Sequence, residues 1–248
     1  MSLPTALSYL TVLRLPGKRQ FDLSRAVYWF PVVGLFLGGL LTLVWWGTEA
    51  IAPRQMAALV TVLAWTWITG GIHLDGLANT SEALLSWRSR SSMHEILTTP
   101  HIGPLGMTAV FAVLAAKGIA LDNMTTERAA VALFVAPVFG RSAQVVATFL
   151  SPYAKVDGVA VSAFGGGKTW LRVLVALAPL VLVLQLGPER AVVAFAGWVV
   201  LVMGLVFRIR NLLGGMTGGT MGAMTEIVEA WIMIAATLDP PRLVSFGF

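Results

Sequence analysis

Cysteine is missing from the 248 residues, and charged side chains are scarce, at 12% of the chain. The absence of cysteine excludes disulfides, thiolate nucleophiles and metal sites built on thiolates. An ordinary soluble domain carries roughly 25% charged residues, so this chain has too few charges to cover a soluble surface. Since 57% of the residues are hydrophobic, we expect a single all-α integral membrane domain, 1–248, whose surface faces lipid.

Long apolar stretches predict a polytopic bundle of about seven transmembrane helices, with six as the alternative. Several stretches are shorter than the ~20 residues of a typical span, and the last one carries Glu226 and Glu229. The candidate spans are Ala26–Thr48, Gln55–Gly70, Gly103–Leu121, Ala129–Leu150, Leu171–Leu186, Ala191–Phe207 and Met224–Leu238. Before the first span, leucines recur at helical spacing and predict a short interfacial N-terminal segment, 1–25.

The distribution of lysine and arginine predicts a cytoplasmic N-terminus. Of the seventeen basic residues, eleven fall in connections on the predicted cytoplasmic side, four on the other side, and Lys117 and Arg141 fall within spans. Lys117 lies toward the outer end of its span, where we expect it to snorkel to the surface. The formal charge of +5 therefore reflects membrane topology, and the scattered basic residues do not indicate nucleic acid.

Three polar connections fall on the predicted cytoplasmic side, and together they predict one polar site at that face. The first, 71–102, holds all three histidines and is the expected active-site loop; the other two, 151–169 and 208–222, are rich in glycine. No two histidines have the four-residue spacing of a helical zinc site. The glycine run before Lys168 lacks the first glycine of a P-loop and follows no strand, which excludes an ATPase.

Oxygen-bearing side chains recur near the start of the first connection. Asp75, Asn79 and Glu82 are four and three residues apart, so they share one face if this stretch is helical. Carboxylate and amide oxygens suit magnesium, which completes its coordination with water and substrate phosphate. The alternative is a solvated helix face beside the membrane.

Besides Lys117, the predicted spans hold the charged residues Arg141, Glu226 and Glu229. Charge within a membrane is costly and usually functional. The alternative is an Arg–Glu pair that joins two helices, because buried charges need partners in any case.

The stretch Gly70-Gly71-Ile72-His73-Leu74-Asp75-Gly76-Leu77-Ala78-Asn79-Thr80 closely resembles the hallmark of the cobalamin synthase family, the adenosylcobinamide-GDP ribazoletransferases. Further segments resemble those of the family in the same order along the chain. They are Phe30-Pro31-Val32-Val33-Gly34, Ile102-Gly103-Pro104-Leu105-Gly106, Pro137 to Arg141, Pro152-Tyr153-Ala154-Lys155 and Gly214-Gly215-Met216-Thr217-Gly218. The resemblance covers nearly the whole chain.

The resemblance implies transfer of the adenosylcobinamide phosphate group from adenosylcobinamide-GDP to α-ribazole or its 5′-phosphate, with release of GMP and with magnesium as cofactor. Such a displacement needs metal and cationic groups to neutralise the diphosphate. It also implies a bacterial or archaeal inner membrane with the active site facing the cytoplasm, and a homo-oligomer is compatible with it. The implied catalytic residues are Asp75, Glu82 and His73, the magnesium ligands Asp75, Asn79 and Glu82, and the substrate-binding residues Arg88, His101, Arg141, Lys155, Gly214, Gly215 and Gly218.

Several positions depart from the family pattern, and these departures leave an alternative function open. Family members usually carry Asp at Asn79, Glu82 and Gly219, Gly at Ala83, Lys-Asp at Thr98-Thr99 and Arg at His101. Fewer carboxylates weaken magnesium binding, so the alternative is a repurposed homologue acting as a membrane transporter or binding subunit. A transporter places polar groups near the bilayer midplane, whereas most polar residues here fall at the predicted cytoplasmic ends. Phospholipid head-group transfer ranks last, because its spaced aspartates are missing.

Overall fold

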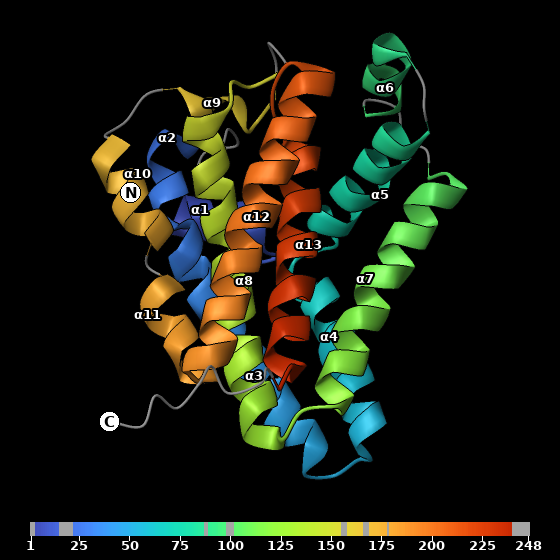
Figure 1. Ribbon diagram of the computed structural model, residues 1–248, viewed down its shortest axis with the longest axis vertical. Helices are drawn as coiled ribbons and strands as arrows, with labels where there is room; N and C mark the ends of the chain where they lie inside the picture. The colour runs from blue at the N-terminus through green and yellow to red at the C-terminus, as the bar shows by residue number, and fades with distance from the viewer. Residues whose placement is uncertain are drawn as a thin grey trace, which may run out of the picture.

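The computed structural model consists of α-helices (Figure 1) and describes residues 3–14, 22–86, 89–97, 102–154, 158–165, 169–177 and 179–239. The helices are α1 (Leu3–Leu10), α2 (Leu23–Ala26), α3 (Phe30–Glu49), α4 (Arg54–Ile68), α5 (Ile72–Leu85), α6 (Arg90–Ile96), α7 (Pro104–Asp122), α8 (Thr126–Leu150), α9 (Val161–Phe164), α10 (Thr169–Leu177), α11 (Pro179–Val183), α12 (Pro188–Leu213) and α13 (Gly218–Thr237), with 3₁₀ turns η1 (Val27–Trp29) and η2 (Leu184–Leu186). Within the described residues, extended segments pair only at an isolated bridge between Tyr153 and Met216. The predicted all-α class is confirmed.

Four helical stretches are long and apolar enough to cross a membrane: Leu23–Glu49, which contains α3, and the helices α7, α8 and α12. Helices α4 and α5 meet at 90° and pass the same test together as one bent span. The described residues therefore contain four candidate spans, or five with the bent pair. Seven spans and a cytoplasmic N-terminus stay predictions. Helix α13, which contains most of the predicted seventh span, is not among the four.

Helix α8 is the centre of the bundle and is buried along most of its length. Helix α3 approaches it closely at two glycines one turn apart: a Cβ added at Gly34 would lie 2.7 Å from the carbonyl oxygen of Pro137, and one at Gly38 would lie 2.6 Å from that of Phe134. Small residues allow membrane helices to come together in this way. Two of the segments that carry the family resemblance, 30–34 and 137–141, thus meet in the core.

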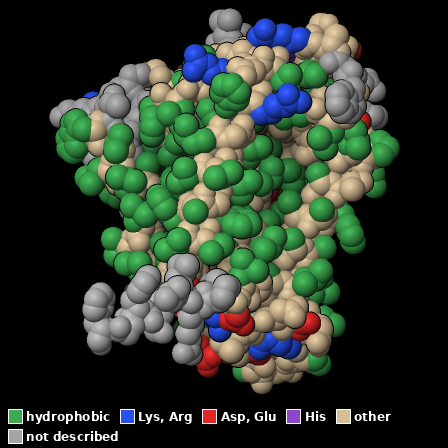
Figure 2. All heavy atoms as spheres, in the orientation of Figure 1, with side chains coloured by type: hydrophobic (Ala, Val, Ile, Leu, Met, Phe, Trp, Pro, Cys, Tyr) green, Lys and Arg blue, Asp and Glu red, His purple; other side chains and the backbone are tan. Residues whose placement is uncertain are grey.

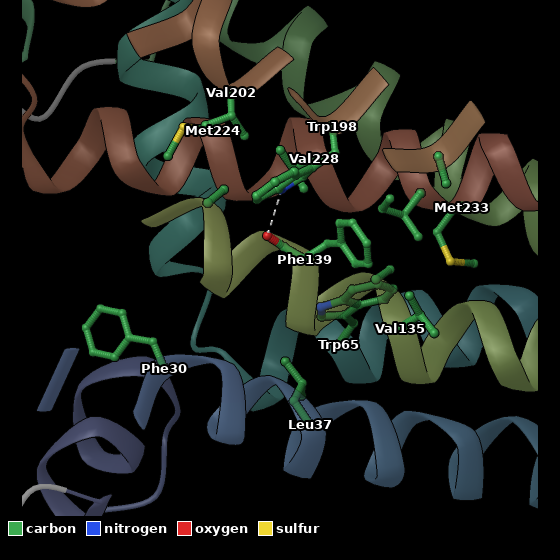
Figure 3. Packing of buried hydrophobic residues seen from close by; sticks show 14 of the residues in the cluster. Phe30, Leu37, Trp65, Val135, Phe139, Trp198, Val202, Met224, Val228 and Met233 are labelled. Atoms are coloured by element: carbon green, nitrogen blue, oxygen red, sulfur yellow. Dashed lines mark hydrogen bonds between the residues drawn. The ribbon is translucent and has the colours of Figure 1, made fainter. Parts of the chain in front are cut away.

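Aromatic side chains join α12 to the central helix (Figure 3). Trp198 of α12 donates its indole N–H to the carbonyl oxygen of Phe139 at 3.2 Å, and the two rings meet edge to face with centroids 5.6 Å apart. A buried indole N–H needs such an acceptor. The contact fixes α12 against α8, on the side of the bundle where α13 also packs.

The N-terminal helix packs into the protein. Ala6 and Leu10 of α1 are fully buried, and Leu3 and Leu7 pack against the same core. The leucine face predicted for the segment 1–25 therefore contacts the bundle itself over residues 3–10, because α3 and α2 cover it.

The described part of the stretch 71–102 is mostly helical, which corrects the interpretation of this stretch as a loop. Its described part forms α5 and α6, and Figure 1 shows α5 running from the middle of the bundle toward the end where α6 lies. The polar composition of this stretch concealed its helices, because Leu77 is the only long apolar side chain among the buried residues of α5.

Candidate active site

Helix α5 begins at a break inside the bundle. Gly70 and Gly71 have φ of +63° and +67°, a left-handed conformation that glycine adopts readily. The break frees the last carbonyl groups of α4, and the carbonyl oxygen of Ile68 accepts a hydrogen bond of 2.9 Å from the N–H of Val12. Backbone groups at membrane depth must be satisfied within the protein. The N-terminal segment therefore stabilises the break between α4 and α5, and this break sets the direction of α5.

Helix α5 lies close to α13, and the two helices run in opposite directions. A Cβ at Gly76 would collide with the carbonyl oxygen of Gly219, and one at Gly222 would lie 3.1 Å from the Cα of His73. Moving forward along α5 from residue 73 to residue 76 thus means moving back along α13 from residue 222 to residue 219. This register decides which side chains of α5 meet the start of α13.

Asp75, Asn79 and Glu82 do share one helix face, as predicted, because this stretch is helical. This face is called the oxygen face below. Asp75 is exposed, and its Oδ1 accepts a hydrogen bond of 3.2 Å from the amide of Asn79. The amide oxygen of Asn79 is buried and has no hydrogen-bond partner among the described residues. An exposed carboxylate and an unpartnered amide oxygen, one turn apart, are suitable ligands for a hard cation.

Glu82 has a structural partner at the start of α7. Its Oε2 accepts a hydrogen bond of 3.0 Å from the N–H of Gly106, and its carboxylate packs against Gly103. A carboxylate at a helix N-terminus caps free N–H groups and interacts favourably with the helix dipole. Glu82 is 8% exposed, and its contacts join α5 to α7. Asp75 and Asn79 are then the residues of the oxygen face that do not join helices. In the described part of the chain, no three His, Asp or Glu side chains are grouped to hold a metal ion.

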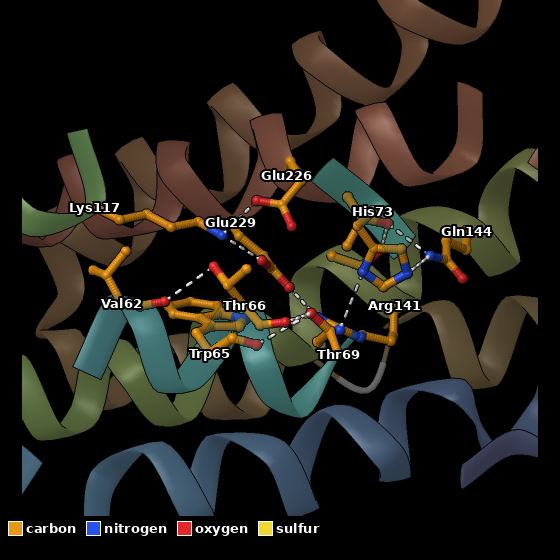
Figure 4. Close-up of polar contacts among 12 residues, drawn as sticks. Val62, Trp65, Thr66, Thr69, His73, Lys117, Arg141, Gln144, Glu226 and Glu229 are labelled. Carbon is orange, nitrogen blue, oxygen red and sulfur yellow. Dashed lines mark hydrogen bonds and ion pairs between the residues drawn. The ribbon is translucent and has the colours of Figure 1, made fainter. Parts of the chain in front are cut away.

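His73 is enclosed by α8, as Figure 4 shows. Its Nδ1 lies 3.4 Å from Nη2 of Arg141, and its Nε2 lies 3.2 Å from the amide of Gln144, which in turn contacts Thr225 at 2.7 Å. Arginine only donates hydrogen bonds, so Nδ1 is the acceptor in the contact with Arg141. Both ring nitrogens are engaged, and His73 fixes the first turn of α5 to the central helix.

Four charged side chains form a buried cluster beside His73 (Figure 4). Arg141 forms an ion pair with Glu229, while the ammonium of Lys117 lies 2.7 Å from Glu229 and 2.8 Å from Glu226. The same ammonium lies 4.0 Å from the ring centroid of Trp65, a cation–π contact. All four charged side chains are at most 4% exposed, and two cations balance two carboxylates.

The cluster corrects the prediction that Lys117 snorkels to the surface and gives Arg141 a structural role. Lys117 does not snorkel to the surface: it points into the bundle, because two carboxylates of α13 attract it there. Arg141 has no exposed surface and is paired with Glu229, so it joins α8 to α13, and its predicted contact with substrate stays a prediction. The Arg–Glu pair considered from the sequence is present, and Lys117 is the member that sequence reasoning missed.

The glycine-rich segment 214–219 meets a second polar connection. Gly214 ends α12 with φ of +85°, and Met216 exchanges two backbone hydrogen bonds with residues 152–154, at 2.8 and 2.9 Å. Thr217 then begins α13 with a capping box shared with Thr220. Two of the three connections predicted to share a site are therefore paired through their backbones.

Two tyrosines lie beside this segment. The phenol of Tyr153 accepts a hydrogen bond from the backbone N–H of Gly218, and burial raises its pKa. Burial raises the pKa of Tyr9 to about 12, and the neighbouring Tyr153 adds to the rise. Both phenols therefore keep their protons at neutral pH and are hydrogen-bond donors beside Gly218.

Figure 2 shows the surface over these elements. Basic side chains gather at the end of the molecule where α6 lies, and below them the surface is hollowed between the pair α12 and α13 and the pair α5 and α7. Acidic atoms are visible inside the hollow. At the opposite end acidic and basic side chains lie together, as in the ion pairs Arg54–Glu49 and Arg190–Asp239.

Three of the predicted substrate-binding residues, Arg88, His101 and Lys155, lie outside the described residues. Arg90, which sequence reasoning did not select, lies with its guanidinium against the Cα of Gly214. No spacing in the sequence connects these two residues, since 123 positions separate them along the chain. Only the approach of α6 to the end of α12 brings them together.

Comparison with known proteins gives one consistent family. The family model described as cobalamin-5-phosphate synthase matches residues 2–237. A protein of Chlorobaculum tepidum named adenosylcobinamide-GDP ribazoletransferase is 33% identical over 242 residues, covering 95% of this chain and 94% of the relative. Proteins of the same name from Roseiflexus sp. (strain RS-1) and Herpetosiphon aurantiacus are 34% and 31% identical, covering 95% and 93% of this chain and 89% and 94% of the relatives. No solved structure matches the chain.

Proposed function

The chain belongs to the cobalamin-5-phosphate synthase family, and we propose that it transfers the adenosylcobinamide phosphate group from adenosylcobinamide-GDP to α-ribazole or its 5′-phosphate. A ribose hydroxyl oxygen of the acceptor bonds to the phosphorus next to adenosylcobinamide, the bond from that phosphorus to the oxygen shared with GMP breaks, and the hydroxyl proton is lost. GMP is the leaving group. The names of the relatives describe this transferase, and the protein acts in the final steps of cobalamin synthesis.

The observation that carries the proposal is a pair of residues near the start of α13: Asp75, which is exposed, and Asn79, whose buried amide oxygen has no hydrogen-bond partner among the described residues. The free oxygen of Asn79 and the carboxylate of Asp75 fit magnesium, which binds proteins through one or two carboxylates and keeps water and phosphate as its other ligands. When bound there, magnesium neutralises charge on the diphosphate. Gly214, Gly215 and Gly218 belong to the segment that leads into α13, the helix that packs against α5, and we propose that this segment binds substrate phosphates.

Two residues implied as catalytic are better described as positioning residues. His73 holds α5 against α8, and Glu82 holds α5 against α7. Each has its polar atoms engaged by neighbouring helices, and both are more than nine-tenths buried. Asp75 is the acidic residue of the face that remains open to substrate.

The location of the site supports an orientation with this end in the cytoplasm of a bacterial or archaeal cell. Arg90, Arg208 and Arg210 are exposed at the same end as the hollow, whereas Arg54, Arg128 and Arg190 at the other end pair with acidic side chains. Excess positive charge on short connections stays on the cytoplasmic side of the inner membrane. The large charged substrates of the reaction are then reached from the cytoplasm.

The test of the function is GMP release by the purified protein in detergent, given adenosylcobinamide-GDP, α-ribazole phosphate and magnesium. We expect release that EDTA abolishes and added magnesium restores, because the diphosphate needs charge neutralisation. The Chlorobaculum tepidum relative serves as the positive control. Folded protein that releases no GMP while the relative does so would refute the transferase and favour a binding or transport role.

Replacing the neutral ligand by an acid is expected to strengthen the magnesium site. Asn79→Asp should lower the magnesium concentration for half-maximal GMP release about tenfold, equivalent to about 1.4 kcal/mol, since ligand charge tunes the affinity for hard cations. The matched control is Asn123→Asp, the same change at an exposed position at the end of α7. An unchanged magnesium requirement in Asn79→Asp would remove this residue from the metal site.

A further inference from the structure

Two buried oxygen atoms of α5 have no hydrogen-bond partner among the described residues. They are the amide oxygen of Asn79 and the hydroxyl of Thr80. Thr80 is 4% exposed, and a buried hydroxyl without a partner destabilises the fold. Such a group calls for an explanation, and one explanation is a ligand that supplies the missing partner.

The register between α5 and α13 places both atoms. Asn79 and Thr80 follow Gly76 by three and four residues, so they lie one helical turn further along the side of α5 that faces α13. Because the helices run in opposite directions and α13 begins at Gly218, one turn beyond the Gly76–Gly219 contact along α5 reaches the start of α13. The two unpartnered oxygens therefore lie at the level of the start of α13.

The start of α13 offers groups that bind anions. The N–H groups in the first turn of a helix have no partner within the helix; that of Gly218 donates to Tyr153 and that of Thr220 to Thr217. The N–H of Gly219 lies in the same first turn, and Gly219 is partly exposed. An anion that approaches this N–H also meets the positive end of the helix dipole.

The third component is the guanidinium of Arg90. It lies against Gly214, and both residues are exposed. A side chain at position 214 would displace it, so the glycine keeps the guanidinium close to the backbone of the segment 214–219. Arginine binds phosphate through several parallel hydrogen bonds.

We propose that Arg90, the hydroxyl of Thr80 and the N–H of Gly219 form a subsite for the phosphate of a nucleoside 5′-monophosphate group, namely the one that leaves as GMP. The assignment rests on the proposed function for the identity of the nucleotide. Asn79 adjoins Thr80 in α5 and is hydrogen-bonded to Asp75, so a diphosphate reaching from the subsite past Asn79 places its second phosphate at the oxygen face. The subsite then binds the leaving group, and the oxygen face lies beside the phosphorus that is attacked.

Equilibrium binding of GMP and of guanosine to the purified full-length protein tests the subsite. Arg90→Ala should weaken GMP binding roughly 10- to 100-fold, the range expected for a lost charged hydrogen bond, and should leave guanosine binding unchanged. Arg90→Lys should restore part of the GMP affinity. Thr80→Val, which keeps the shape and removes the hydroxyl, should weaken GMP binding by about fivefold.

The matched control is Arg208→Ala, an exposed arginine near the end of α12 at the same end of the molecule. It removes the same charge and should change GMP binding by less than about twofold, as expected for a screened surface charge. An equal loss in Arg208→Ala and Arg90→Ala would overturn the subsite in favour of general surface charge.

Binding and turnover separate this proposal from the proposed function. Normal GMP release together with unchanged GMP binding in Arg90→Ala would overturn the subsite and leave the transferase intact. Wild-type protein that binds GMP through Arg90 and Thr80 but releases none from adenosylcobinamide-GDP would support the subsite and overturn the transferase.

Discussion

Asp75→Asn is expected to reduce GMP release roughly a thousandfold, the scale on which removal of a group that stabilises transition-state charge acts. Asp75 is the exposed carboxylate of the oxygen face, and its replacement leaves two neutral amides beside the diphosphate. The side chain is exposed, so the variant should fold and elute as the wild-type protein does. The rate of GMP release at saturating substrate, measured across a magnesium titration, is the readout.

The control for Asp75→Asn is Glu127→Gln, which neutralises an exposed carboxylate at the opposite end of the molecule, in the first turn of α8. It should retain the wild-type rate and magnesium dependence. Raising magnesium should recover part of the activity of Asp75→Asn if the lost carboxylate is a ligand. A rate within tenfold of wild type at unchanged magnesium would show that the reaction does not use this carboxylate.

Removing one charge from the buried cluster is expected to destabilise the fold strongly. Arg141→Met leaves two carboxylates facing a single lysine inside the bundle, and an uncompensated buried charge costs about 3–5 kcal/mol. For a chain of this size that corresponds to a fall in melting temperature of about 10 °C. Thermal unfolding of the detergent-solubilised protein, followed by intrinsic tryptophan fluorescence, measures the change.

The second variant in this series distinguishes charge balance from loss of contacts. Arg141→Met combined with Glu229→Gln returns the cluster to zero net charge, since Lys117 keeps Glu226 as its partner. The double variant should therefore melt higher than Arg141→Met alone. If the two single effects simply add, the cluster has no energetic coupling and charge balance is not what stabilises it.

An exposed ion pair provides the comparison. Arg190 pairs with Asp239, whose side chain is 77% exposed, and such pairs contribute only about 0–1 kcal/mol. Arg190→Met should therefore shift the melting temperature by only a few degrees. The contrast with Arg141→Met measures what burial adds to the same loss of charge.

The same cluster explains how the bundle holds the site. It draws charged side chains from α7, α8 and α13 to one point, and His73 connects that point to the first turn of α5. Asp75 follows His73 by two residues, so the direction of α5 and the position of its carboxylate depend on these buried contacts. The site is open at its surface, but its support lies in the interior.

The fold class and several residues of the site could be predicted from the sequence alone. The low charge and high apolar content determined a helical membrane protein, because few other structures satisfy their backbone in lipid. The spacing of Asp75, Asn79 and Glu82 placed them on one helix face through the 3.6-residue period. An ion pair between Arg141 and a glutamate of α13 could also be considered from the sequence, since charge within a membrane requires partners.

Only the tertiary structure decided which of these groups are open to substrate and which are structural. It assigned Glu82 to the start of α7, turned Lys117 inward and brought Arg90 to Gly214. Periodicity determines which residues share a face of one helix, and composition determines which faces avoid water. Contacts between helices depend instead on how closely small residues let two backbones approach and on the register that follows, as at Gly76 and Gly219, and a single sequence does not encode that pairing locally.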